Sequence, residues 1–460
     1  MDNETKETTM QLPTLIVVVI TAFITTFTGS ALNLSVPAIG SEFNASAAMV
    51  GWIVNGYILA AAVLAVPFGR FADMTGRKRI LVTGIFTFAI CAGGAAFATS
   101  MGMLVLLRII QGIGAAMIFC TNTAVLISVC SPDTRGRALG VSVASTYIGL
   151  SAGPVVGGLL NHNLGWRSIF IMTFIVSITA FIIAVKKLPG GKIKKDWQGL
   201  DIAGNILYIL MITLIMYGLS SFSTHAYAKF LILAGVVLFA IFIFHELKTA
   251  HPIIEVRLFA NNIGYSFSNL AALLNYSATF ALGYLLSIYL QVVKGFDSQI
   301  AGIVLISQPL VMAILSPYAG RLSDRVSPFK LASIGMALCT VGLFSFIFIS
   351  ENYPFVLIIA NLIVVGIGFA FFSSPNTNAV MACVEKEDYG VASSILSTMR
   401  SIGHSASMAI VTFIISSQMG TATLNDAEPG QIVETMHIAF IVFTIVCAVG
   451  IFISLKRKQS

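Results

Sequence analysis

Two arginines and one histidine lie inside long apolar stretches of this 460-residue sequence, where an ionisable side chain is costly. They are Arg108, Arg400 and His404. An arginine at the centre of a membrane helix costs about 2.5–3.5 kcal/mol on insertion scales, so each should face the protein interior or a water-filled cavity. Arg400 and His404 are four residues apart and therefore share one face of a helix. Such a pair could bind an anionic group through the guanidinium while the imidazole titrates near neutral pH.

Each of these residues also has a purely structural interpretation. Arg400 and His404 could form a polar packing pair that backbone carbonyls satisfy. For Arg108 we favour a structural or gating role, through hydrogen bonds to polar groups of the first helix, over direct contact with a substrate.

Amide and hydroxyl side chains within the same stretches are further candidates for the wall of a cavity. Taken singly, each is more often an interhelical hydrogen bond than a ligand contact. The candidates are Asn33, Asn55, Asn122, Tyr147, Asn275, Gln308, Asn361 and Asn376.

Acidic residues are missing from the interiors of the apolar stretches. Asp201 and Glu434 lie at expected helix ends, and the other carboxylates fall in loops or termini. Proton coupling is most simply performed by a desolvated carboxylate, which would also attract organic cations. The polarity of the expected cavity therefore comes from cations and amides. The six cysteines have no metal-ligand spacing, and we expect no metal and no other cofactor.

The elements that position these residues are membrane helices. The sequence is 57% hydrophobic and 10% charged, whereas soluble domains carry about 25% charged residues. A span needs about 20 apolar residues, and lipid offers the backbone no partner, so each such stretch must be a helix. Fourteen stretches qualify: residues 12–34, 49–68, 80–99, 103–125, 138–160, 169–185, 202–221, 229–244, 266–290, 300–319, 331–349, 355–380, 393–415 and 436–453.

Basic residues predict the orientation. With the amino end in the cytoplasm, only Arg167, Lys229 and Lys294 of the 26 basic residues fall outside, and Arg108 and Arg400 fall within helices. This bias is a strong positive-inside signal. The acidic start of the chain favours a retained first helix over a signal peptide. We expect a multi-pass protein of a bacterial inner (cytoplasmic) membrane with both termini in the cytoplasm.

The loop between the second and third helices carries a specific pattern. It reads G-R-F-A-D-M-T-G-R-K-R over residues 69–79, with Gly69, Asp73, Gly76 and Arg77 at the defining positions. Glycines allow a tight turn, and Asp73 can pair with a cation or a helix amino end. The loop resembles the signature loop of the major facilitator superfamily. A related sequence, G-R-L-S-D-R, follows the tenth helix at residues 320–325, as a duplicated six-helix bundle would place it.

Two more motifs resemble that superfamily. Arg108 and Gln111 belong to R-I-I-Q-G in the fourth helix, and Gly153 and Pro154 to G-L-S-A-G-P-V-V-G-G in the fifth. The second motif resembles one associated with antiporters. Physically, its glycines permit close helix packing and Pro154 can kink the helix, so a pure packing role stays open.

Further stretches from about residue 27 to residue 410 resemble the fourteen-helix drug:proton antiporter branch. That branch usually has an Asp in the first helix, at the position that Thr28 occupies here. The resemblance implies an all-α major facilitator fold: an N-terminal six-helix bundle (residues 1–187), two inserted helices (188–252) and a C-terminal six-helix bundle (253–460). It also implies gating residues, which are Gly69, Asp73, Gly76, Arg77, Arg108, Gln111, Gly153, Pro154, Asp324 and Arg325.

The resemblance implies a secondary active transporter that exports small amphipathic compounds, as in multidrug efflux, by alternating access and proton antiport. Charge pairs of Asp73 and Arg77 with Asp324 and Arg325 would close the cytoplasmic side. The residues leave open an exporter of an endogenous anionic or zwitterionic metabolite with weak or atypical proton coupling. We expect a monomer in the lipid bilayer with small-molecule and proton partners and no nucleic acid. An enzyme is not expected, because no catalytic motif is present.

Overall fold

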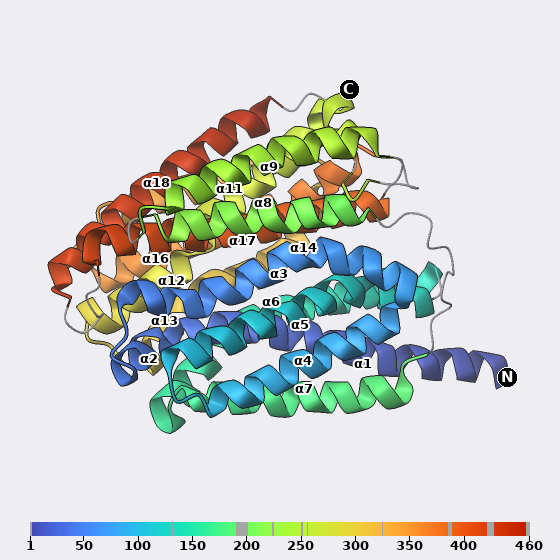
Figure 1. Ribbon diagram of the computed structural model, residues 1–460, viewed down its shortest axis with the longest axis horizontal. Coiled ribbons are helices and arrows are strands. Elements are labelled where there is room, and N and C mark those ends of the chain that lie inside the picture. The colour runs from blue at the N-terminus through green and yellow to red at the C-terminus, as the bar shows by residue number, and fades with distance from the viewer. Residues whose placement is uncertain are drawn as a thin grey trace.

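The computed structural model describes residues 2–130, 132–189, 201–222, 225–249, 252–254, 256–323, 325–384, 389–420 and 427–456. Within these residues the chain forms helices that run side by side along the long axis of the molecule (Figure 1). In chain order they are α1 (Asp2–Ala31), η1 (Leu32–Ser35), α2 (Val36–Glu42), α3 (Ala47–Thr75), α4 (Arg77–Ala96), α5 (Met101–Val129), α6 (Pro132–Leu164), α7 (Arg167–Lys187), α8 (Ile202–Ser220), α9 (Ala228–Lys248), α10 (Val256–Asn261), α11 (Ile263–Thr279), α12 (Leu282–Ile288), η2 (Tyr289–Val293), α13 (Ser298–Leu305), α14 (Ser307–Ser323), α15 (Pro328–Phe346), α16 (Phe355–Met381), α17 (Tyr389–Met419) and α18 (Pro429–Leu455).

Twelve helical segments within the described ranges are long and apolar enough to cross a membrane. The sequence predicts fourteen spans, and the difference lies in α6 and α17. These two helices have 33 and 31 residues, but neither is among the twelve. Several side chains in the first turns of both helices lie outside the described part of the chain, and both helices carry many glycines and serines. The prediction of an all-α membrane fold is confirmed, whereas the count of fourteen and the inserted helix pair are not.

Helix ends follow the local sequence. Ser46, Ser100 and Asp297 each accept a hydrogen bond from the backbone N–H three residues later, as an N-cap residue does. Gly76 lies between α3 and α4 with φ of 106°, a conformation that favours glycine, so the chain reverses there without a longer loop. The expected eighth helix, residues 229–244, is longer in the structure, because α9 continues to Lys248.

The molecule has two ends, the terminal face and the opposite face. At the terminal face, on the right in Figure 1, the amino terminus lies near the junction of α3 with α4. The opposite face, on the left, holds the junction of α4 with α5. Helices from the first and second halves of the chain pack together, and a cavity lies between the halves.

Candidate functional site

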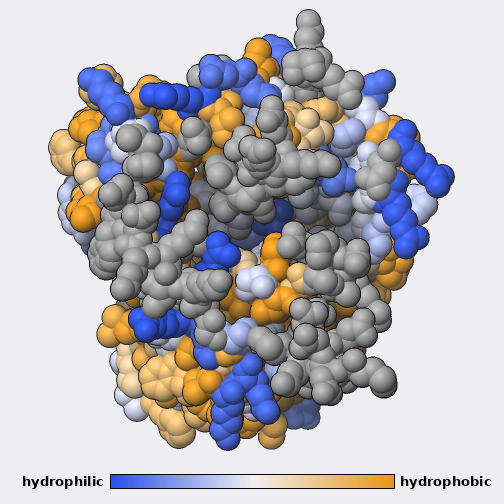
Figure 2. Space-filling model, turned by 90° about the vertical axis from the view of Figure 1, so that its right-hand side faces the viewer, coloured by the Kyte–Doolittle hydropathy of each residue, from blue (hydrophilic) through white to orange (hydrophobic). Residues whose placement is uncertain are grey.

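A cavity of about 370 Å³ lies between the two halves of the chain. Ligand pockets occupy roughly 300–1,000 Å³, so this cavity can hold a small organic molecule. Its walls come from α1, α3, α5 and α6 on one side and from α11, α13, α14, α16 and α17 on the other. Figure 2 shows the terminal face hollowed near its centre. Six predicted site residues line this cavity: Asn33, Tyr147, Pro154, Gln308, Arg400 and His404.

Arg400 and His404 lie one turn apart on α17 and face an aromatic wall from α11. The Arg400 guanidinium carbon is 5.1 Å from the centroid of the Tyr276 ring. The His404 ring lies 4.2 Å from the Phe280 ring at an interplanar angle of 30° and meets Tyr276 edge-on at 5.2 Å. Tyr276 is fixed in turn, because its hydroxyl lies 3.1 Å from the Ser373 hydroxyl. An aromatic face beneath a cation stabilises its position without neutralising its charge.

Two polar atoms in the lining of the cavity have no hydrogen-bond partner among the described residues. Among the described residues, no acceptor lies within hydrogen-bond distance of Arg400 Nε, and no donor reaches Asn33 Oδ1. A buried polar atom without a partner is costly, so these atoms are suited to a bound molecule. Neither Asp nor Glu is found among the described residues that line the cavity. Arg400 is therefore the permanently charged residue of the described lining, and its charge makes the cavity positive.

The other predicted polar residues lie outside the cavity lining. Asn55 donates to Ser220 Oγ at 3.0 Å. Asn122 accepts from Thr21 Oγ1 at 3.0 Å, and Asn361 donates to Ser345 Oγ at 2.8 Å. Most of these amides thus join one helix to another, as single polar residues in membrane bundles commonly do. The remaining two, both buried outside the lining, are Asn275 and Asn376.

Arg108 is fully buried, and its partners differ from those expected. Its Nε donates to the Ile53 carbonyl at 3.0 Å, and its Nη1 donates to Gln111 Oε1 at 2.7 Å. The guanidinium carbon lies 4.2 Å from the centroid of the Tyr57 ring. The prediction of partners on the first helix is therefore wrong. Tyr57, which donates to the Thr25 carbonyl at 3.4 Å, supplies the link to α1 instead.

The glycines of the fifth-helix motif hold α6 against its neighbours. A Cβ on Gly153 would come within 2.6 Å of Ser30 Cβ, and one on Gly157 within 2.7 Å of Ala31 Cα. A Cβ on Gly302 would lie 2.0 Å from the Pro154 carbonyl oxygen. Backbone contact at this distance is possible only for glycine. The motif thus packs α6 on α1 and meets the second half of the chain.

Contacts between the halves close the cavity toward the opposite face. Ser287 Oγ donates to the Asn33 carbonyl at 2.6 Å, and Ser298 Oγ donates to the Gly158 carbonyl at 3.1 Å. Nearer the start of α3, a Cβ on Gly51 would lie 3.2 Å from Thr412 Oγ1. Helices from both halves therefore meet tightly at this end.

The expected gating residues of the two G-R-x-x-D motifs lie at the terminal face, whereas Arg108, Gln111, Gly153 and Pro154 lie within the helix bundle. Gly69 lies near the end of α3, where a Cβ would meet Cys120 at an ordinary 3.7 Å, and Gly76 forms the reversal that follows. Arg77 and Arg325 are exposed. The Asp73 side chain and Asp324 lie outside the described part of the chain. The charge pairs between the halves thus stay a prediction.

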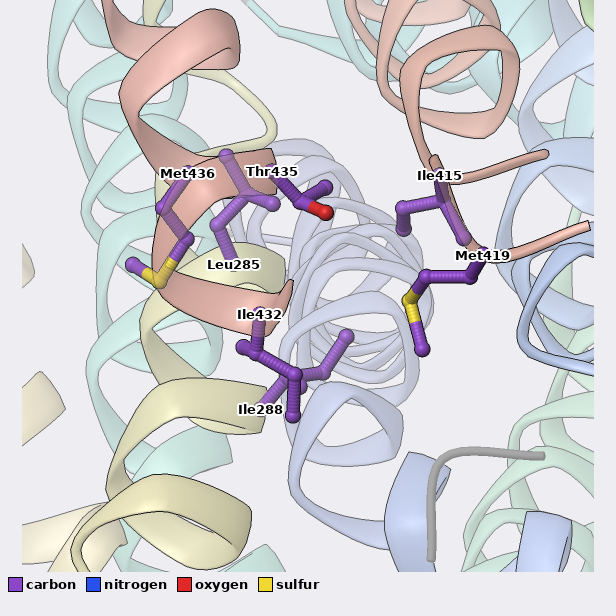
Figure 3. A pocket seen from close by; sticks show the side chains of 7 residues that line it. All are labelled: Leu285, Ile288, Ile415, Met419, Ile432, Thr435 and Met436. Carbon is purple, nitrogen blue, oxygen red and sulfur yellow. The ribbon is translucent and has the colours of Figure 1, made fainter. Parts of the chain in front are cut away.

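A second, much smaller space does not form a binding site. It lies among α12, α17 and α18, and Figure 3 shows aliphatic and methionine side chains around it. Its volume is about 10 Å³, room for at most one water molecule. Thr435 is its one polar residue, and that hydroxyl already donates to the Gln431 carbonyl at 2.7 Å.

Several residues of the site escaped the sequence analysis. Tyr276 and Phe280 form the wall opposite Arg400, and their spacing of four residues was the available signal, since it places two rings on one helix face. Outside the cavity, Glu246 is 2% exposed in the last turn of α9 and also escaped the sequence analysis. It was missed because the expected helix ended before it.

A family model described as Major Facilitator Superfamily matches residues 18–246 and 268–460, which is most of the chain. The chain belongs to this superfamily. It is thus a multi-pass membrane transporter of a family that does not consist of enzymes in general, and it has bacterial relatives.

Two relatives and one solved structure illustrate its similarities. The riboflavin transporter RibZ of Clostridioides difficile (strain 630) is 26% identical over 441 residues, covering 96% of each chain. The multidrug resistance protein Stp of Mycobacterium tuberculosis (strain ATCC 25618 / H37Rv) is 27% identical, covering 90% of this chain and 77% of Stp. The crystal structure of a bacterial homologue of the human lysosomal transporter Spinster superposes with a TM-score of 0.70 at 14% identity, covering 98% of this chain and 99% of that one. That likeness concerns the fold alone.

Proposed function

We propose that this transporter exports small amphipathic compounds by alternating access, and that it prefers neutral or anionic aromatic compounds to organic cations. One observation carries this proposal: the cavity joins an aromatic wall to an arginine with an unpaired donor, and its described lining has no carboxylate. A planar aromatic molecule can stack on such a wall while an acceptor group reaches Arg400. A cation would be repelled by Arg400 and would find no counter-charge.

The relatives support the first part of this proposal. One is named for multidrug resistance and another for riboflavin, a neutral compound with a planar ring system. Both names agree with a cavity that takes aromatic amphiphiles. The cavity favours the alternative drawn from the sequence, an anionic or zwitterionic substrate, over a typical cationic drug.

The proposed topology has fourteen spans. α6 and α17 are each long enough to cross a bilayer, at about 1.5 Å of rise per residue. With them, residues 1–187 and 253–460 would form two six-helix bundles, and α8 and α9 the inserted pair. The basic loops at the terminal face support a cytoplasmic location for that face in a bacterial cell. The cavity, closed toward the opposite face, would then be loaded from the cytoplasm.

The proposed transport cycle alternates between closure at the two faces. Contacts such as Ser287 with Asn33 would separate when the outer side opens, and charge pairs around Arg77 and Arg325 would then close the cytoplasmic side. Proton antiport would drive the cycle. His404 is the group in the described cavity lining whose ordinary pKa places its charge change between pH 5 and 8, so it is the proposed coupling residue.

A transport assay in liposomes tests this proposal. The purified protein is reconstituted under an imposed pH gradient and given riboflavin, carboxyfluorescein or ethidium as neutral, anionic and cationic probes. We expect gradient-dependent movement of the neutral or anionic probe and little movement of ethidium. Transport of ethidium alone would overturn the charge preference, and transport that ignores the pH gradient would overturn proton coupling.

A further inference from the structure

A cluster of three potential metal ligands lies at the terminal face, away from the central cavity. Asp201 precedes α8, and His245 and Glu246 lie in the last turn of α9. Because α8 and α9 are antiparallel neighbours, the beginning of one helix lies beside the end of the other. One ligand atom from each residue lies within 4.8 Å of the other two.

Each carboxylate in the cluster is anchored through one oxygen to the backbone. Asp201 Oδ1 accepts from the Gly204 amide at 2.8 Å, and Glu246 Oε2 accepts from the Ile254 amide at 2.9 Å. This anchoring orients the second oxygen of each group. Asp201 Oδ2 lies 3.0 Å from His245 Nε2. Outer hydrogen bonds of this kind orient the ligands of metal sites.

Glu246 provides an independent sign of a missing ligand. The residue is 2% exposed, and its Oε1 has no hydrogen-bond partner among the described residues. A Cβ on Gly204 would lie 2.2 Å from Asp201 Oδ2 and 2.5 Å from Glu246 Oε1. Asp201 Oδ2 and Glu246 Oε1 therefore converge over Gly204, where the absence of a side chain leaves space for them. A buried carboxylate oxygen with no partner is costly, and a cation would satisfy it.

The charge of the cluster suits a cation. Burial opposes ionisation of Asp201, but the hydrogen bond from the Gly204 amide and the pairing with His245 hold the pKa of the Asp201 carboxyl below its usual range. The His245 side chain is 32% exposed, which leaves a path for an ion from solvent. His245 Nε2 also lies 3.2 Å from the Thr249 hydroxyl, which a metal would displace from that nitrogen.

We propose that Asp201, His245 and Glu246 bind one divalent transition-metal ion of the zinc or manganese class. One imidazole nitrogen with two carboxylate oxygens is a ligand set that these ions accept, at about 2.0–2.2 Å for zinc, with water completing the coordination. The separation of His245 Nε2 from the Asp201 oxygens, 2.9 and 3.0 Å, suits two ligands of one ion.

Such an ion would stabilise the terminal face. It would join α8, α9 and the segment at residues 252–254, because Glu246 already holds Ile254. The neighbouring Pro252 carbonyl accepts a hydrogen bond at 2.6 Å from Nη2 of Arg70, a motif residue in the last turns of α3. Metal binding would therefore strengthen the link between the α8–α9 pair and the expected gate.

Zinc binding by the purified full-length protein in detergent tests the proposal. Zn²⁺ is titrated by calorimetry, the melting temperature is measured with and without Zn²⁺, and Mg²⁺ serves as the comparison ion. We expect one Zn²⁺ per chain and a raised melting temperature, with no such effect of Mg²⁺. Glu246→Gln and His245→Gln should each weaken Zn²⁺ binding by about tenfold or more, since even outer-shell changes cost that much.

The controls separate this site from other zinc ligands. His162→Gln removes an exposed histidine near the opposite face and should bind Zn²⁺ as the wild type does. Replacement of the partly exposed Cys120, Cys130 and Cys383 by serine excludes binding by thiols. If Glu246→Gln does not fold, His245→Gln still decides, because that side chain is partly exposed.

Two results would overturn the proposal. One is a wild-type protein that binds no Zn²⁺, in which case a proton shared between the two carboxyl groups would occupy the cluster. The other is Zn²⁺ binding that neither His245→Gln nor Glu246→Gln weakens. Both results are independent of the transported substrate, so they leave the proposed transport function untouched.

Discussion

Arg108 and Arg400 have the same side chain and a similar aromatic neighbour, yet they occupy different environments. Each guanidinium lies over a tyrosine ring, at 4.2 Å for Arg108 and 5.1 Å for Arg400. Arg108 is fully buried outside the cavity lining and donates to Ile53 and Gln111, while its Nη2 has no partner among the described residues. Arg400 faces the cavity, and its Nε has no acceptor within the described structure.

The difference between the surroundings of Arg108 and Arg400 indicates a different role for each arginine. A guanidinium that donates to fixed acceptors of its own bundle holds helices together. One that retains an unpaired donor on a cavity wall is available to a ligand. We therefore expect changes at Arg108 to alter folding and changes at Arg400 to alter transport.

The largest expected effect is that of Arg108→Ala on stability. The change leaves Gln111 Oε1 without its donor in a buried site, at about 1–3 kcal/mol, and removes the side-chain hydrogen bond to the helical Ile53 carbonyl. We expect a lower melting temperature in detergent and less protein in the membrane. Arg400→Ala is the matched control and should melt close to the wild type. Equal destabilisation by the two variants would contradict the assignment of a structural role to Arg108 alone.

The next effect is that of Arg400→Gln on transport. Loss of a charged donor to a substrate acceptor removes about 1.5–3 kcal/mol of binding, or roughly 10- to 150-fold in affinity. Transport of carboxyfluorescein in liposomes should therefore fall by about that factor, while the amount of protein in the membrane stays unchanged. Arg400→Lys, which keeps the charge, should retain part of the activity. Unchanged transport by Arg400→Gln would remove this residue from the binding site.

A smaller effect is expected for His404→Gln, which tests the titratable member of the pair. The substitution keeps a polar side chain beside Phe280 but cannot gain a proton. The pH dependence of transport between pH 5 and 8 should become flatter, with little change in the rate at the optimum. The measurement is a series of liposome assays at fixed substrate concentration. A pH profile identical to that of the wild type would exclude His404 from proton coupling.

The smallest effect is expected for Tyr276→Phe. The ring beneath Arg400 is retained, and only the hydroxyl contact with Ser373 is lost. Transport should change by less than about fourfold. A neutral hydrogen bond contributes roughly 0.5–1.5 kcal/mol, and we expect at most about half of it to bear on binding, because the hydroxyl acts only through the position of the ring. Tyr276→Ala removes the ring and should reduce transport further. Equal losses for both variants would show that the hydroxyl, not the ring, positions Arg400.

Much of the fold could be predicted from the sequence, because the constraint is local. Lipid forces each apolar stretch to satisfy its own backbone, so the helices follow from hydropathy. The superfamily followed from short motifs. Two of their residues, Gly76 and Gly153, must be glycine for steric reasons: Gly76 has a positive φ, and Gly153 lies against α1. The same hydropathy signal predicted α6 and α17 as residues 138–160 and 393–415, although both helices carry many glycines and serines.

The residues that are costly to bury were evident from the sequence, because Arg108, Arg400 and His404 lie in apolar stretches whatever the packing. The groups that contact them depend on the packing, because apart from Gln111 these partners come from other helices. The packing placed Tyr276 beneath Arg400 and Ile53 beside Arg108. It also brought Asp201 to Glu246, 45 positions later, because two antiparallel helices return the chain to the same face.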